Sequence, residues 1–183
     1  ISKQDFDARV ASAQAEYENY GVEVTEETLA SIKEEVLEQL IDELLLTQAA
    51  KQAGVVVTTA EIDAYYAEMA AGYADEAAFL AAAKENGFTQ ASLREAIADV
   101  LLILNYQEQY IEDNVDPATI AVTETEMRAL YASYAETIED LPPYAEGAEL
   151  LAQELRDQKI TALGIMNTLI EGLRAAATIE RTL

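Results

Sequence analysis

The side chains that most often carry out catalysis are missing from this sequence. It has no histidine and no cysteine among its 183 residues. Without histidine there is no Ser-His or Cys-His nucleophile, and without cysteine there is no thiolate, disulfide or sulfur-ligated metal. The seven glycines form neither a phosphate-binding loop nor a dinucleotide fingerprint. We therefore expect no catalytic residue and no cofactor.

Carboxylates are the one reactive group in excess, with 35 Asp and Glu side chains. Glu34, Glu35 and Glu38, or Glu124 with Glu126, have the oxygen chemistry for calcium, but no Asp-rich loop is present to organise six or more ligands. Paired carboxylates about 5–10 Å apart can hydrolyse glycosides, yet so many acids form such pairs by chance. We expect no metal and interpret these side chains as solvated helical faces, while a small carboxylate enzyme remains an open alternative.

The aromatic residues favour binding over chemistry, since the chain has ten tyrosines, three phenylalanines and no tryptophan. Tyrosine offers a large apolar face with a hydroxyl that tolerates water, and methionine adds an adaptable contact. Adjacent Tyr65 and Tyr66 point about 100° apart on a helix, so they do not fill one core face together. The alternative is that such residues are ordinary core or rim packing. We hypothesise that six of them contribute to a cradle for extended polypeptides: Tyr65, Tyr66, Met69, Tyr73, Tyr131 and Tyr134.

The net charge of −24 argues against two classes of partner. A surface this negative repels phosphate backbones and anionic lipid, so we expect neither nucleic-acid binding nor association with a membrane surface. The apolar runs, such as residues 100–104, are far shorter than the ~20 residues that a membrane-spanning helix requires, so direct membrane insertion of this segment is not expected. The acidity itself is best explained as a means of solubility, in a saline or extracellular setting.

The elements that must position these residues are helices, which predicts an all-α fold. Apolar side chains recur at three- and four-residue spacing through residues 25–53, and Gly54 ends that helix. Capping boxes at Thr58 with Glu61 and at Thr123 with Glu126 predict two further helix starts. Further helices are predicted at the following residues: 58–73, 76–85, 89–112, 123–134 and a long terminal helix over 146–177. Residues 179–183 are predicted to form a short strand.

Two stretches resemble the helical chaperone module of SurA and PrsA. The first, VLEQLIDELLLTQAAKQAGVVVTTAEIDAYYAEM at residues 36–69, has a leucine-rich helix with a Gln-x-Ala pattern, a glycine stop, an extended link and a Thr-x-x-Glu-Ile helix start. The second, GFTQASLREAIADVLLILNYQEQYI at residues 87–111, is similar to the module's glycine-led turn into a helix centred on Arg94 and Ile97. Residues 1–17 resemble the family's opening helix, and residues 151–180 resemble its closing helix. A related helical domain occurs in the cytosolic trigger factor.

Residues 122–134, VTETEMRALYASY, are similar to the helix that leads toward a parvulin prolyl isomerase domain in these proteins. Here only the loop around residues 139–144 follows, so the isomerase domain and its paired histidines are missing. The resemblance thus predicts a single helical domain over residues 1–183. Its N-terminal helices would occupy residues 1–114, and its returning helices, with no isomerase insert, residues 122–183. The long terminal helix would pack back on the N-terminal helices.

The resemblance implies an extracytoplasmic holdase-type chaperone that binds unfolded or partly folded polypeptide clients and has no prolyl isomerase activity. It would act in the periplasm or, as a trimmed lipoprotein, at the outer face of the membrane; a start at Ile1 without methionine suggests that an upstream segment was removed. The alternative from a different class is a structural or interaction module for one fixed partner. In another form of this alternative, the chain associates with itself and forms a homodimer by exchange of the terminal helix.

Overall fold

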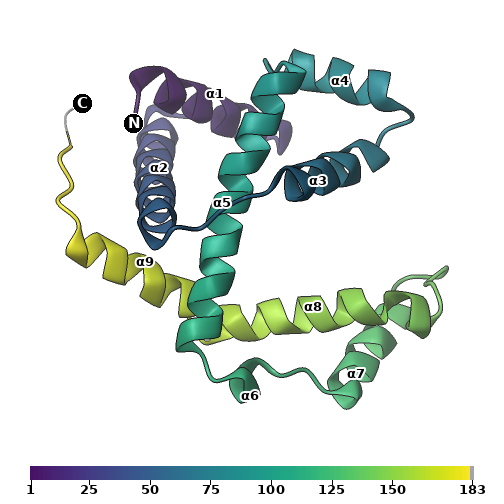
Figure 1. The fold of residues 1–183 in the computed structure, drawn as a ribbon. Helices are drawn as coiled ribbons and strands as arrows, with labels where there is room; N and C mark the ends of the chain where they lie inside the picture. The colour runs from purple at the N-terminus through teal and green to yellow at the C-terminus, as the bar shows by residue number, and fades with distance from the viewer. Residues whose placement is uncertain (182–183) are drawn as a thin grey trace. The chain divides into compact units, whose positions relative to one another are not determined.

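The computed structural model describes residues 1–181, and none of these residues forms a β-strand. The predicted all-α fold is confirmed. The chain divides into two compact units, one of residues 1–106 with 173–181 and the other of residues 107–172. The helices follow in this order: α1 (Lys3–Asn19), α2 (Glu26–Ala53), α3 (Thr59–Ala71), α4 (Glu76–Glu85), α5 (Gln90–Asn114), α6 (Pro117–Ile120), α7 (Glu124–Ala135), α8 (Tyr144–Ala162) and α9 (Ile165–Ala176) (Figure 1).

The first unit begins with the paired helices α1 and α2. The hydroxyl of Thr25 caps α2 by accepting a hydrogen bond from the Thr28 N–H, and Gly54 ends α2 in the left-handed conformation with φ of 75°. Phe6 and Val10 of α1 pack against Ile32 and Val36 of α2 in a buried cluster. Each such side chain contributes roughly 1.5–3 kcal/mol when fully buried, so this cluster holds the helix pair together.

A second buried cluster joins α3, α4 and α5. It contains Tyr66, Phe79, Leu93 and Ile97. The predicted capping box at the start of α3 is present, since Thr58 accepts from the Glu61 N–H while the Glu61 carboxylate accepts from the Thr58 N–H. This cap fixes where α3 begins and therefore which of its side chains face the cluster.

The second unit gathers the end of α5 with α6, α7, α8 and the start of α9. Its buried cluster is formed by Ile111, Ile120, Ile160 and Ile165, so the returning helices pack on α5 as predicted. Between α7 and α8 the chain has only residues 136–143, which leaves no room for a parvulin domain at this point.

Two predictions about the C-terminal region are wrong. The stretch 146–177 is not one helix, because Gly164 adopts the left-handed conformation with φ of 63° and separates α8 from α9. Residues 179–181 form no strand, and residues 182–183 lie outside the described part of the chain. The single turn α6 was not predicted; Pro117 stands at its start, where proline is favourable.

Candidate functional site

An apolar groove of about 710 Å³ lies within the first unit. Its walls come from the start of α1, one stripe of α2 and the chain after α9, residues 177–181. Since those last residues are not helical, their contribution is a length of extended chain. The apolar side chains from the two helices and the N-terminal residue are Ile1, Phe6, Leu37, Ile41, Leu44 and Leu45.

The α2 stripe has a buried base and an exposed edge. Residues 37, 41, 44, 45 and 48 follow one another at spacings of four, three, one and three, which places them along one side of a helix. Ile41 is buried, as is Phe6 opposite it on α1, whereas Leu44 is 41% exposed. A surface that combines a buried apolar base with an exposed apolar rim can accept a further apolar chain without repacking the core.

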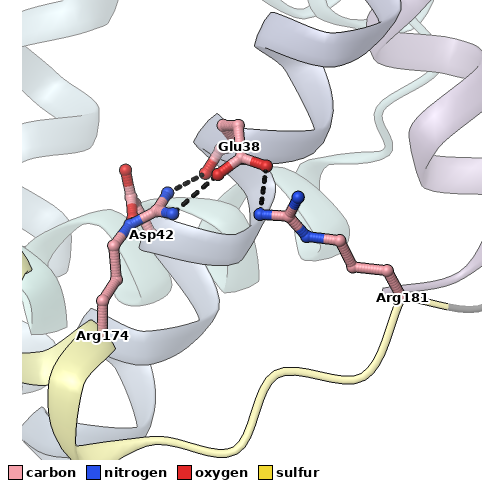
Figure 2. Close-up of polar contacts among 4 residues, drawn as sticks. All are labelled: Glu38, Asp42, Arg174 and Arg181. Atoms are coloured by element: carbon pink, nitrogen blue, oxygen red, sulfur yellow. Dashed lines mark hydrogen bonds and ion pairs between the residues drawn. The ribbon is translucent and has the colours of Figure 1, made fainter.

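Arg181, one of the residues that line the groove, belongs to a network of two carboxylates and two guanidinium groups (Figure 2). Arg174 Nε donates to Asp42 Oδ1 at 2.5 Å, and Arg174 Nη1 donates to Glu38 Oε2 at 2.6 Å. From residues 177–181, Arg181 Nη2 lies 2.7 Å from the other oxygen of the same carboxylate, Glu38 Oε1. Arg174 donates hydrogen bonds to Asp42, which has the larger effect, and to Glu38. These bonds raise the pKa of Arg174 above its ordinary value, so its guanidinium group stays positively charged.

The predicted aromatic residues of the first unit have different environments. Tyr66 is only 8% exposed; its ring meets Phe79 edge-on with centroids 5.1 Å apart, and Arg94 Cζ lies 5.1 Å from its ring centre. Tyr65 is half-buried against the same cluster. Tyr66 thus belongs to the core of α3, α4 and α5, as the alternative interpretation of these residues expected.

Met69 and Tyr73 are the exposed members of the predicted set. Met69 lies in the last turns of α3, and Tyr73 lies just past its end, with 45% of its surface exposed. The Tyr73 ring contacts Phe79 at a centroid distance of 5.2 Å. These two side chains therefore offer apolar surface to solvent while resting on a packed cluster.

Tyr131 and Tyr134 lie in the second unit, where their hydroxyls already have partners. Tyr131 donates to the Pro142 carbonyl at 2.9 Å and packs edge-on against Tyr144, whereas Tyr134 donates to Glu154 Oε1 at 2.5 Å. The hydrogen bond to Glu154 raises the pKa of Tyr134, because ionising the phenol would place two negative charges together. Both rings help to join α7 and α8.

Three of the five carboxylates considered as cation ligands have an arginine or capping partner within the protein. Glu38 binds two arginines, Glu124 pairs with Arg128 at 2.6 Å, and Glu126 caps α7. Among the described residues, no three or more Asp or Glu side chains are grouped so as to hold a metal ion. The first unit thus offers an apolar groove, and the ionised side chains beside it are paired with one another.

The groove was not identified from the sequence. Periodicity predicts the helix that carries Leu37, Leu44 and Leu45, but it does not separate a buried stripe from one that lines an open groove. One signal was available: α2 carries apolar residues at 40, 41, 44, 45 and 46, a wider band than a single packed face requires. No sequence pattern indicates that residues 177–181 form a wall of the groove. The contacts that hold this segment near α2 join Arg174 and Arg181 to Glu38, which is more than 130 residues away in the sequence.

Comparison with known proteins agrees with the resemblance carried by residues 36–69 and 87–111. No helix in residues 1–181 has both the length and the apolar character needed to cross a membrane. Searches of curated proteins and of solved structures return no match to the chain. A family model described as SurA-like N-terminal domain matches residues 1–107, which include α1 to α4, most of α5 and both α1 and α2 of the groove. Since this match spans more than half of the 183 residues, the chain belongs to the SurA-like N-terminal domain family.

Proposed function

We propose that this protein binds unfolded or partly folded polypeptides as an extracytoplasmic holdase-type chaperone without prolyl isomerase activity. The observation that carries the proposal is the apolar groove between α1, α2 and residues 177–181, most of which is built by the residues that match the family. SurA-like domains are typically periplasmic, which supports a location outside the cytoplasm, in the periplasm or at the outer face of the membrane.

The size of the groove suits weak and reversible binding. A client leucine or isoleucine contributes roughly 1.5–3 kcal/mol when it is fully buried. Two or three such side chains must first offset the loss of translational and rotational freedom, which costs about 4 kcal/mol or more. The remainder is at most about 5 kcal/mol, which corresponds to a dissociation constant of about a few tenths of a millimolar or weaker, so clients exchange quickly, as a holdase requires.

The exposed aromatic residues are proposed as a second contact surface. Of the six predicted cradle residues, Met69 and Tyr73 have the exposed apolar surface that an extended chain requires. Tyr65 is a half-buried member of the neighbouring cluster, and Tyr66 and Tyr73 both contact Phe79 of that cluster. In the second unit, Tyr131 and Tyr134 would offer a contact of their own through their ring faces, because their hydroxyls are bonded within that unit.

The breadth of binding distinguishes this proposal from its main alternative, a module for one fixed partner or for self-association through the terminal helices. The chain at increasing molar ratios should slow the aggregation of several unrelated denatured proteins, measured by light scattering. Suppression of one client only, or of none, would favour the fixed-partner module. An acidic control protein of similar net charge shows how much of any effect comes from charge alone.

A further inference from the structure

The network that joins Arg181 of the groove to α2 carries one more negative charge, on Glu38 and Asp42, than Arg174 neutralises. The two carboxylates bring two charges, and Arg174 bonds to both of them and supplies one positive charge. Arg174 also donates through Nη2 to the Glu38 carbonyl at 3.2 Å, so three contacts hold it against α2. The remaining charge is met by Arg181, which contacts Glu38 Oε1 (Figure 2).

The two arginines are held very differently. The Arg174 side chain is 27% exposed and extends from a helix, whereas the Arg181 side chain is 54% exposed and extends from a non-helical segment. A single exposed ion pair of this kind contributes roughly 0–1 kcal/mol. Arg181 is therefore the exchangeable cation of the network, and its place on Glu38 is a subsite for a basic side chain.

The chain's own residues show which sequence pattern fits this subsite. Ile179 is half-buried along the groove, and Arg181 follows two residues later. In an extended chain, residues two apart face the same way, so an apolar side chain can enter the groove while a basic one reaches Glu38. The large negative net charge of the protein adds a long-range attraction for basic segments.

We infer that the groove prefers extended client segments in which an apolar residue is followed two positions later by arginine or lysine. The basic side chain binds Glu38 in place of the Arg181 side chain, which occupies this subsite when no client is bound. The inference rests on the proposed chaperone function and names the class of client that the same groove prefers.

Two labelled peptides test this preference by fluorescence anisotropy. The first has the chain's own sequence over residues 176–181, Ala-Ala-Thr-Ile-Glu-Arg, and the second replaces its arginine by glutamine. The full chain should bind the arginine peptide about threefold more tightly than the glutamine peptide at low salt. The difference should shrink at about 0.5 M salt, where exposed ion pairs are screened.

Variants of the full chain separate local competition from general charge. Arg181→Ala vacates the subsite and should raise the affinity for the arginine peptide about two- to threefold, with little change for the glutamine peptide. Arg128→Ala is the matched control, because it removes one charge from an exposed arginine on α7 that does not line the groove. Glu38→Gln should bind both peptides equally, and its thermal melt is recorded because Arg174 also uses this carboxylate.

Equal binding of both peptides by the unaltered chain, or an Arg181→Ala variant that matches Arg128→Ala, would overturn the inference. Failure of both peptides to bind, while the chain still suppresses aggregation, would also overturn it and would leave the proposed function standing. Failure to suppress the aggregation of any denatured protein is the separate result that removes the chaperone function.

Discussion

Tyr66 and Tyr73 illustrate how residues of one type on one segment acquire different roles. Tyr66 lies inside the cluster with Phe79, and its hydroxyl oxygen lies 3.3 Å from Gln90 Nε2. Tyr73 follows the end of α3 and covers the same Phe79 from the solvent side. Tyr66 is thus part of the buried cluster, whereas Tyr73 contributes to the exposed surface over Phe79.

Replacing each tyrosine by serine should therefore give opposite results. Tyr66→Ser removes a buried ring and should lower the free energy of unfolding by about 3 kcal/mol or more. Tyr73→Ser loses mainly one aromatic contact and should cost less than about 1.5 kcal/mol, while weakening aggregation suppression. Urea denaturation and light scattering measure the two effects. A Tyr66→Ser variant with an unchanged unfolding midpoint would show that this ring is not part of the core.

Residue types in the sequence indicated part of this arrangement. Tyr66 is buried in the cluster and Tyr65 is half-buried against the same cluster, so the 100° separation of the two rings is accompanied by different depths of burial and not by different clusters. The sequence did not indicate which of them is buried, because that depends on Phe79 in a different helix. The ion pairs of Glu38 could not be predicted from the sequence either, because Arg174 and Arg181 lie near the other end of the chain.

At the scale of elements, helix starts were predicted better than helix ends. Both capping boxes are present, because a Thr and a Glu three residues apart satisfy each other's backbone N–H groups locally. The break at Gly164 was missed because glycine within an apolar pattern is compatible with either a weakened helix or a left-handed stop. Ile160 of α8 and Ile165 of α9 lie on either side of this break in one buried cluster, and no local sequence pattern reports such packing.

The capping box of α7 makes a prediction about acid stability. Lys159 Nζ lies 2.7 Å from Glu126 Oε1, and the Thr123 backbone N–H and hydroxyl donate to Glu126 Oε2. These contacts lower the pKa of Glu126 to about 2, with Lys159 having the largest effect and the Thr123 hydroxyl the smallest of the three. A carboxyl whose pKa is lower in the folded state stabilises the fold above its unfolded pKa, near 4.5. That contribution is lost as the pH falls from about 4.5 towards 2.

The Glu126→Gln variant should therefore have a lower free energy of unfolding than the unaltered chain at pH 7. This difference in free energy should shrink as the pH falls from about 4.5 towards 2. Urea denaturation at pH 7, 4 and about 2.5 measures it, since urea adds no ionic screening. Glu139→Gln, in the loop between α7 and α8, is the control for loss of one negative charge. A Glu126→Gln gap that stays constant with pH would show that the cap and Lys159 do not stabilise the ionised form.

For the molecule as a whole, the family resemblance identified the fold class before any contact was known. The order of a leucine-rich helix, a glycine stop and a capped helix start depends on local rules, which is why residues 1–107 could be recognised from sequence. The groove depends on chain far outside that match, since residues 177–181 form one of its walls. The candidate site therefore cannot be identified from residues 1–107 alone, because the folded chain brings one of its walls from the distant C-terminal residues to α1 and α2.

The central claim is that clients bind in the groove between α1, α2 and residues 177–181. Leu44 and Leu150 form a matched pair for testing it, because both are exposed helical leucines, at 41% and 75%, and only Leu44 lines the groove. Glutamine keeps good helix propensity at either position, so both variants should melt close to the unaltered chain.

The most direct measurement is aggregation suppression by Leu44→Gln and Leu150→Gln, compared at equal concentration with the unaltered chain on the same denatured clients. We predict that Leu44→Gln loses at least about half of the suppression, because it places an amide in the apolar groove, while Leu150→Gln retains it. Equal suppression by Leu44→Gln and the unaltered chain, or equal loss in both variants, would contradict binding in this groove.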